Sequence, residues 1–473
     1  QKVLAVMQLC QHSVTYMGLC ASCGKDVSDI VNERNKSRDK RMVTAGVHSS
    51  SAFLVSMEEA MIRAEQEQKR LLQARKLSLV LDIDATLIHS CTPRELAEPL
   101  DWDAIKDTFA GDLHSFQLFQ LDYFVKLRPF LREFLDQAHE LFELHLYTLG
   151  ERSYADKISQ ILDPEERLFH DRVLSATECE GMRGKDVTRL FPVSDDMVII
   201  MDDRNDVWRD APNLIVVPPY HFWDSMRELN NSAGNRWLST SVKPMADETD
   251  VPLQAILQVL QSIHQEFFSL VDQQKQPRTR ELLQKRVRSV LRGLSLVFSG
   301  VFPTNSNPRN SDVWCGACRC GAVCQEDIVP GQTTHVVAAK FGSAKVIRGL
   351  QLGIPVVTLD WLVDSVRQWK RKEELAYRFP EEETALPKLR EVWANEEGHV
   401  LEGLPKEGQG GDLEDKEEGW ESADEEEEDE EEDDEDEDEE EAERLLSAIL
   451  QSDGSKFSRN RESQEVEEME GRL

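Results

Sequence analysis

Two aspartates and a threonine follow a short apolar run near the start of the chain. The run Leu77–Leu81 leads into Asp82, Asp84 and Thr86, which form a D-x-D-x-T pattern. A carboxylate can attack a phosphate monoester and form an aspartyl-phosphate, which splits one difficult displacement into two easier steps. A second acid two residues later can protonate the leaving alkoxide and then activate water. The pattern taken by itself leaves a plain alternative open, in which each aspartate only caps a turn.

Four more polar residues occur later in the chain in similar settings. Thr148 follows the apolar stretch Leu144–Tyr147, the pair Asp202 and Asp203 follows another apolar run, and Lys185 lies between them. Thr148 can donate to phosphoryl oxygens, and Lys185 can offset their charge. Because nucleophile and substrate are both anionic, we expect Mg²⁺ to neutralise charge, with the acidic pair completing its site. All these groups in this order favour the chemical interpretation over the capping one.

The elements that position these residues follow from hydrophobic periodicity. Phe134–Leu141 has a helical pattern, and Val198–Met201 is typical of a buried strand. Ser56 and Glu59 form a capping box, which predicts a helix to about Arg75. Strands that alternate with helices predict an α/β fold with a mostly parallel sheet and helices on both faces. In such sheets ligands bind at the carboxyl ends of the strands, where the chemically capable residues fall.

These segments resemble a known family. The stretches RKLSLVLDIDATLIHS, YFVKLRPFLREFL, LHLYTLGERSYA and DMVIIMDDRNDVW are similar to the haloacid-dehalogenase-like phosphatases, and within them to the TFIIF-associating phosphatases of the RNA polymerase II C-terminal domain. The similarity spans most of Val55–Pro380. It implies a Rossmannoid parallel sheet and a Mg²⁺-dependent protein serine/threonine phosphatase. The implied substrate is the phosphorylated heptad-repeat tail of the polymerase's largest subunit, and the implied location is the nucleus.

The resemblance also implies a role for each site residue. Asp82 is the nucleophile and Asp84 is the general acid–base, while Thr148 and Lys185 bind the phosphate. The implied metal ligands are Asp82, Asp84 through its backbone carbonyl, and Asp203, with Asp202 close by.

Two positions depart from the family pattern. The family's S-R-[DE]-E-C appears here as S-A-T-E-C, so an expected arginine is missing at Ala176. The loss weakens the inferred phosphate clamp unless Arg172 or Arg183 substitutes. Ala85 replaces the usual polar residue inside D-x-D-x-T, where we expect little effect because its neighbours carry the chemistry.

A second module, from about Val297 to Pro380, resembles a BRCT domain. The segments that carry this resemblance are FSG at 298–300, THVVA at 334–338, GIPVV at 353–357 and DWLVDS at 360–365. By position, Ser299 and the backbone of Gly300 are placed to hydrogen-bond a phosphate while Lys345 pairs with its charge. The alternative is a purely structural BRCT domain. Trp361 is expected in its core.

Two groups of cysteines suggest metal binding. At the amino terminus, Cys10, His12, Cys20 and Cys23 are the ligand types that tetrahedral Zn²⁺ takes, and the surrounding turn resembles a zinc knuckle. The alternative is an unstructured end. The later group has cramped spacing where the BRCT resemblance places a helix and a strand, so packed thiols are expected there. Its members are Cys315, Cys318, Cys320 and Cys324.

The formal charge of −35 is unevenly distributed. Every residue of Asp424–Glu441 is acidic, and such a block repels itself and cannot bury apolar surface, so we expect a disordered tail. After it, Arg444–Gln451 predicts a short apolar helix, and the resemblance implies that this tail docks on the large subunit of TFIIF. No broad basic surface indicates nucleic-acid binding. No apolar run reaches the roughly 18–20 residues that span a bilayer.

The expected organisation has five parts: a zinc-knuckle segment (1–30), a phosphatase domain (55–225), a helical bridge (250–292), a BRCT domain (293–381) and an acidic tail with a docking helix (395–473). The main alternative to an active enzyme is a catalytically impaired scaffold with a phosphatase fold, which binds the phosphorylated polymerase tail through its BRCT domain. The intact D-x-D-x-T argues for the enzyme. The BRCT module and the acidic tail argue against a phosphatase of small metabolites.

Overall fold

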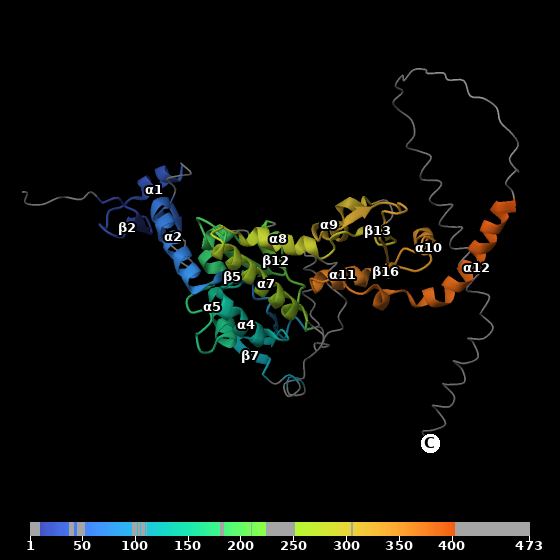
Figure 1. Cartoon of the computed structure of the whole chain (residues 1–473). Helices are drawn as coiled ribbons and strands as arrows, with labels where there is room; N and C mark the ends of the chain where they lie inside the picture. Colours follow the sequence, from blue (N-terminus) through green and yellow to red (C-terminus); the bar gives the residue numbers. More distant parts are fainter. Residues whose placement is uncertain are drawn as a thin grey trace, which may run out of the picture. The chain divides into compact units, whose positions relative to one another are not determined.

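The computed structural model contains two compact units (Figure 1). The first holds residues 1–289 and 367–370, and the second holds 290–366 and 371–473. The acidic run 424–441 and the expected docking helix 444–451 lie outside the residues that the structure describes. The described residues are 10–36, 42–44, 53–96, 102, 105, 109, 111–179, 184–209, 211–223, 251–303 and 306–402.

Parallel strands form the central sheet of the first unit, in the order β10-β9-β5-β11-β12. Every residue of β5 and β11 is buried, which explains why these strands are continuous apolar runs rather than alternating ones. The expected parallel α/β sheet is confirmed. The strands are β5 (Leu77–Leu81), β9 (Phe142–Tyr147), β10 (Val173–Leu174), β11 (Val198–Asp202) and β12 (Leu214–Val216).

The hydrophobic core of this sheet includes residues of the helices α4 (Leu131–Leu141), α5 (Arg152–Leu162) and α7 (Pro252–Asp272). Helix α7 packs against α4, and α8 (Thr279–Ser289) follows it in the same unit. Both helices fall inside the segment expected as a helical bridge (250–292), and both lie in the first unit. The domain boundaries remain predictions. Among the described residues, no helix combines the length and the apolar character that a bilayer span requires.

A small antiparallel sheet precedes the central one, in the order β2-β1-β4-β3. Strand β4 (Phe53–Ser56) leads directly into α2 (Met57–Ala74). There the Ser56 side chain accepts a hydrogen bond from the Glu59 N–H at 3.3 Å. This cap confirms the predicted helix start, and Arg75 ends the helix in a left-handed conformation just before β5. The other elements here are β1 (Val14–Tyr16), β2 (Leu19–Cys20), α1 (Ser28–Asn35) and β3 (Met42–Thr44).

A three-stranded antiparallel sheet is inserted between β5 and α4, in the order β6-β8-β7. Its strands are β6 (Ile88–Cys91), β7 (Leu113–Leu118) and β8 (Leu121–Leu127). Because β6 follows D-x-D-x-T at once, this sheet begins beside the candidate site. Three short turns of helix lie in the loops of the central sheet, namely η1 (Ala176–Cys179), α6 (Val187–Leu190) and η2 (Asp206–Trp208).

The second unit has its own parallel sheet, in the order β14-β13-β15-β16. Trp361 lies in its core, as expected, with no exposed surface. The strands are β13 (Ser295–Ser299), β14 (Val323–Gln325), β15 (His335–Ala338) and β16 (Val356–Thr358). The helical elements are η5 (Pro308–Asn310), α9 (Asp312–Arg319), α10 (Ala344–Gln351), α11 (Leu359–Arg367), η6 (Glu374–Tyr377) and α12 (Pro380–Glu402).

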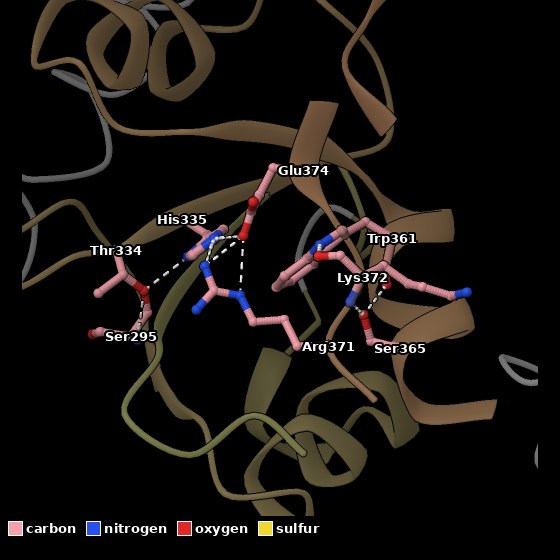
Figure 2. A network of polar contacts seen from close by, with 8 residues as sticks. All are labelled: Ser295, Thr334, His335, Trp361, Ser365, Arg371, Lys372 and Glu374. Atoms are coloured by element: carbon pink, nitrogen blue, oxygen red, sulfur yellow. Dashed lines mark hydrogen bonds and ion pairs between the residues drawn. The ribbon is translucent and has the colours of Figure 1, made fainter. Parts of the chain in front are cut away.

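A polar network around the buried His335 ties β15 to the segment after α11 (Figure 2). The His335 ring stacks on Trp361 with centroids 4.8 Å apart, and its Nε2 lies 3.2 Å from a Glu374 carboxylate oxygen. Arg371 donates to the same carboxylate. Burial lowers the pKa of His335 below its ordinary value, although Glu374 acts in the opposite direction. The folded network therefore favours the neutral imidazole.

We expect the free energy of unfolding of the second unit to fall as the pH drops below about 6.5. The unfolded chain then binds a proton at His335 that the folded chain, with its lower pKa, does not yet bind, so protons favour unfolding. Hydrogen exchange of β15 peptides between pH 7.5 and 5 measures this. In His335→Gln the loss of stability between pH 7.5 and 5 should be smaller. An unchanged pH dependence in this variant would show that His335 does not cause the loss.

Candidate active site

The chemically capable residues gather at the carboxyl edge of three neighbouring strands. Asp82 follows β5, Thr148 follows β9 and Asp202 ends β11. The carboxylate oxygens of Asp82, Asp202 and Asp203 all lie within 4.8 Å of one another. Parallel strands present their carboxyl ends on one side, so residues more than a hundred positions apart in sequence meet there.

Lys185 lies in the middle of this acidic group and is buried. Its ammonium donates to one oxygen of Asp82 and to Asp202 Oδ2, the latter at 2.6 Å. The rings of Tyr147 and Trp208 flank the ammonium at 5.7 and 5.6 Å from their centroids. The structure thus brings the predicted Lys185 directly to the predicted nucleophile.

Burial and crowding shift the pKa values of the group. Burial and the charge of Asp202 raise the pKa of Asp82 well above its usual range, against the opposing effect of Lys185. Burial and Asp202 also raise the pKa of Asp203 to about 7. Three carboxylates thus face one ammonium, and a divalent cation would offset the remaining charge. Oxygen ligands are those that Mg²⁺ prefers, so the group fits this ion.

The two adjacent aspartates differ in what they have left to offer a cation. Asp202 Oδ2 accepts from Lys185 and from Trp208 Nε1 at 2.7 Å, while its Oδ1 accepts from the Arg204 N–H at 2.8 Å. Both of its oxygens are therefore occupied. Asp203 accepts a 3.2 Å bond from the Thr86 hydroxyl. Within the described residues, Asp202 therefore holds Lys185, while Asp203 keeps more of its carboxylate for another partner. Trp208 was not singled out by sequence.

Asp84 does not join the acidic group. Its Oδ1 lies 2.6 Å from the Tyr154 hydroxyl and 2.9 Å from the Ser90 hydroxyl, and these two hydroxyls are 2.7 Å apart. Burial and Asp84 raise the pKa of Tyr154 well above its usual range, so this phenol stays protonated. Sequence reasoning missed both residues, because nothing in their local patterns points to Asp84.

The loop that carries D-x-D-x-T is held by residues distant in sequence. The buried Arg128 donates to the Thr86 carbonyl at 3.0 Å, and the Tyr220 N–H donates to the Ala85 carbonyl at 2.7 Å. Ala85 has φ of 59°, a left-handed conformation that is uncommon outside glycine. The backbone at Ala85 is therefore strained, and these surrounding hydrogen bonds keep it in place.

The phosphate-binding side is less complete than the family pattern. The buried Thr148 hydroxyl accepts from the Gly150 N–H at 2.9 Å, and the Ala176 N–H donates to the Gly150 carbonyl at 3.0 Å. Arg172, considered as a substitute for the missing arginine, donates to the carbonyls of Leu144 and Leu168, both at 2.9 Å. Its guanidinium is thus used in holding backbone. Arg183 lies outside the described residues.

The residues predicted to form a phosphate pocket in the second unit contact protein groups in the structure. The Ser299 hydroxyl, at the end of β13, lies 2.6 Å from the Ser343 hydroxyl, which caps α10. Gly300 follows with φ of 63°. Lys345, on α10, donates to the Glu326 carbonyl at 3.0 Å. Ser343 was not predicted, and its contact with Ser299 appears only in the fold.

The two cysteine groups behave differently. Ligand atoms of Cys10, His12, Cys20 and Cys23 all lie within 4.8 Å of one another, because β1 and β2 form a hairpin that brings both ends together. The later group forms no such cluster within the part of the chain that the structure describes. Its cysteines lie on or next to α9 and β14, as expected. The expectation of packed thiols was only partly right, because Cys320 is buried while Cys315 and Cys318 are exposed.

The strand order and the place of the D-x-D-x-T loop are those of the haloacid-dehalogenase-like phosphatases. Comparison with family models agrees with this class. A model described as NLI interacting factor-like phosphatase matches residues 77–267. A second, described as BRCA1 C Terminus (BRCT) domain, matches residues 318–366.

The relatives are more specific. The chain is 30% identical to RNA polymerase II C-terminal domain phosphatase-like 4 of Arabidopsis thaliana, over 82% of this chain and 85% of that protein. It is 31% identical to a variant of the fission yeast RNA polymerase II CTD phosphatase Fcp1 solved with beryllium fluoride, with a TM-score of 0.54 over 67% of this chain and 100% of that one. The chain therefore belongs to the family of RNA polymerase II C-terminal-domain phosphatases.

The chain does not span all of its relatives. It is 30% identical to an RNA polymerase II C-terminal domain phosphatase of Caenorhabditis elegans. That match covers 81% of this chain and 58% of the length of the Caenorhabditis protein. The match to the phosphatase of the same description from Schizosaccharomyces pombe covers 66% of its length.

Proposed function

We propose that the chain is a Mg²⁺-dependent protein serine/threonine phosphatase that acts in the nucleus on the heptad-repeat C-terminal domain of the RNA polymerase II largest subunit, through an aspartyl-phosphate. The observation that carries this is the position of Asp82 at the end of the central strand, in contact with Lys185 and beside Asp203. The names of the relatives, which are polymerase phosphatases, support the choice of substrate.

The proposed roles follow from the contacts. Asp82 attacks phosphorus, and Lys185 holds the attacking carboxylate and offsets charge on the phosphoryl oxygens. Asp84 gives a proton to the departing serine oxygen and later takes one from water. Thr148 donates to the phosphoryl group. Asp82, Asp203 and the Asp84 carbonyl would hold Mg²⁺, which neutralises charge on the transferred group.

The test is phosphate release from heptad peptides phosphorylated on a single serine, with and without Mg²⁺. We expect release that needs the metal and stops on chelation. The competing function, a catalytically impaired scaffold, is favoured by the missing arginine at Ala176. Tight peptide binding without any release would support the scaffold and overturn the enzyme.

We propose further that the second unit binds phosphopeptides through Ser299, the Gly300 backbone and Lys345. Support comes from the paired Ser299 and Ser343 hydroxyls and from Lys345 on the same helix that Ser343 caps. Such a reader beside a phosphatase would raise the effective substrate concentration. Lys345→Ala should weaken binding of a phosphopeptide but not of its unphosphorylated form. If the unmodified chain binds both forms with equal affinity, the second unit does not recognise the phosphate.

The tail outside the described residues is proposed to bind the large TFIIF subunit. The acidic block supplies attraction that salt weakens, and the apolar residues of 444–451 supply a contact that salt does not weaken. Changing Leu446 and Ile449 together to Asp should abolish binding of a 424–457 peptide at low and at high salt. If binding survives, charge alone accounts for it.

We propose that the amino-terminal group binds Zn²⁺. Cys10 Sγ and Cys20 Sγ lie 3.6 Å apart, and Cys23 Sγ lies 3.5 Å from His12 Nδ1. The edge of a tetrahedron with Zn–S bonds of about 2.3 Å is roughly 3.8 Å, and edges to nitrogen are slightly shorter. The four side chains therefore have nearly the spacing that the ion requires.

We expect about one zinc per chain after dialysis against a weak chelator, and less than about half of that in Cys20→Ser. The matched control is Cys315→Ser, an exposed thiol outside the group, which should keep its zinc. Elemental analysis of the purified protein measures both. Equal zinc contents in the two variants would show that zinc does not bind at the amino-terminal group.

A further inference from the structure

Asp84 stands apart from the other carboxylates, in a cluster of hydroxyls. Its Oδ1 is within hydrogen-bonding distance of Tyr154 from α5 and of Ser90 from β6. Each hydroxyl carries a single proton and donates to one acceptor at a time. Either both donate to Asp84, or Tyr154 donates to Ser90, which donates to Asp84. In both arrangements Asp84 Oδ1 is an acceptor.

This arrangement has a consequence for where Asp84 can carry a proton. An oxygen that accepts hydrogen bonds from hydroxyls is a poor site for a proton of its own, because the donors would have to turn away. The proton of a neutral Asp84 is therefore directed to Oδ2. The same bonds restrain rotation of the carboxyl group, so that the proton is presented in one direction.

The Tyr154 ring is itself fixed. It packs near Phe116 and Tyr123 of the inserted sheet, with centroids 6.2 and 5.7 Å away. The loop after β9 also comes so close that a Cβ built at Gly150 would lie 2.9 Å from the Tyr154 ring and 3.2 Å from the Thr148 hydroxyl. The ring therefore links the phosphate-binding loop to Asp84.

We propose that Tyr154 and Ser90 are positioning residues, which orient Asp84 and hold its proton on Oδ2 for transfer to the leaving serine oxygen. The proposal rests on the phosphatase function above, since it assigns a role within that reaction. In the step concerned, the Asp82–phosphorus bond forms as the phosphorus–serine oxygen bond breaks. The Asp84 proton passes to the serine oxygen, so that serine leaves as an alcohol and Asp84 remains as a carboxylate.

The test separates acid assistance from a general loss of catalysis through the leaving group. A phosphoserine peptide releases an alkoxide that needs the proton, whereas p-nitrophenyl phosphate releases a stabilised phenolate that does not. The quantity compared is kcat/KM, because it excludes the later hydrolysis of the phosphoenzyme. In Tyr154→Phe we expect a loss of roughly 10- to 100-fold for the peptide and about twofold or less for p-nitrophenyl phosphate.

Two further variants support the interpretation. Ser90→Ala should show the same selective loss, and it keeps the proposal testable if Tyr154→Phe does not fold. Tyr123→Phe removes a hydroxyl from a neighbouring ring and should leave both substrates within about twofold.

The outcomes distinguish this inference from the proposed function. If the unmodified chain releases phosphate from neither substrate, the proposed function fails and the inference fails with it. If the unmodified chain is active but Tyr154→Phe and Ser90→Ala slow both substrates equally, or neither, the positioning role is wrong while the phosphatase stands.

Discussion

Asp82→Asn is expected to lower kcat/KM for phosphoserine peptides by about 10⁴-fold or more, since asparagine cannot form the aspartyl-phosphate. The fold should persist. The raised pKa of Asp82, which has its origin in burial and in Asp202, means that the folded chain disfavours a charge there. A neutral side chain of the same shape is therefore tolerated, and Lys185 keeps its 2.6 Å bond to Asp202.

Phosphate release and trapping of labelled phosphoenzyme measure this effect. A matched control is Asp156→Asn on α5, where the carboxylate is exposed and pairs with Arg152 along the helix. That variant should retain full activity. Substantial turnover by Asp82→Asn, with no labelled protein in the unmodified chain, would place the nucleophile elsewhere.

Lys185→Met is expected to remove activity and to destabilise the first unit by about 3–5 kcal/mol. The lysine is 4% exposed and is the ammonium between Asp82 and Asp202. Burial alone would lower its pKa, but the charges of Asp202 and Asp82 outweigh burial and raise it. Removing the lysine leaves two buried carboxylates without their shared counter-charge. Hydrogen exchange of β5 and β11 peptides reports the loss of stability.

Neutralising one carboxylate should recover part of that loss. In the double variant Lys185→Met with Asp82→Asn, one of the two uncompensated charges is gone, so we expect a recovery of about 1–3 kcal/mol without any recovery of activity. Lys69→Met is the control, because this lysine is exposed on α2 and pairs with Glu65 at the surface. Strict additivity of the two substitutions would show that Lys185 and Asp82 do not interact.

Much of the central sheet could be predicted from local sequence. The run Leu77–Leu81 is a strand with those same ends, and Ser56 caps the helix before it. Parallel strands buried on both faces are apolar throughout, and a polar residue can follow only where the strand leaves the core. That physical constraint made Asp82, Thr148 and Asp202 recognisable, since each stands at such an exit.

Composition and motif also determined the kind of chemistry. A carboxylate at a strand end, with a second acid two residues on, suits phosphoryl transfer, and the later polar residues in the expected order favoured that chemistry over turn capping. Residue types and spacing also predicted a zinc site at the amino terminus, although only the hairpin of β1 and β2 brings its four side chains within 4.8 Å of one another.

Hydrogen-bond partners were decided by the tertiary structure. Tyr154 reaches Asp84 from 70 residues away, and Arg128 reaches the Thr86 carbonyl from 42. Such contacts leave no local pattern, because any polar side chain at the right place on a packed helix or strand could make them. The same holds for Arg172, which the sequence offered as a phosphate ligand and which the fold uses to hold the Leu144 carbonyl. Local sequence determines where a chain leaves its core, and only packing determines which distant donor lies opposite each acceptor.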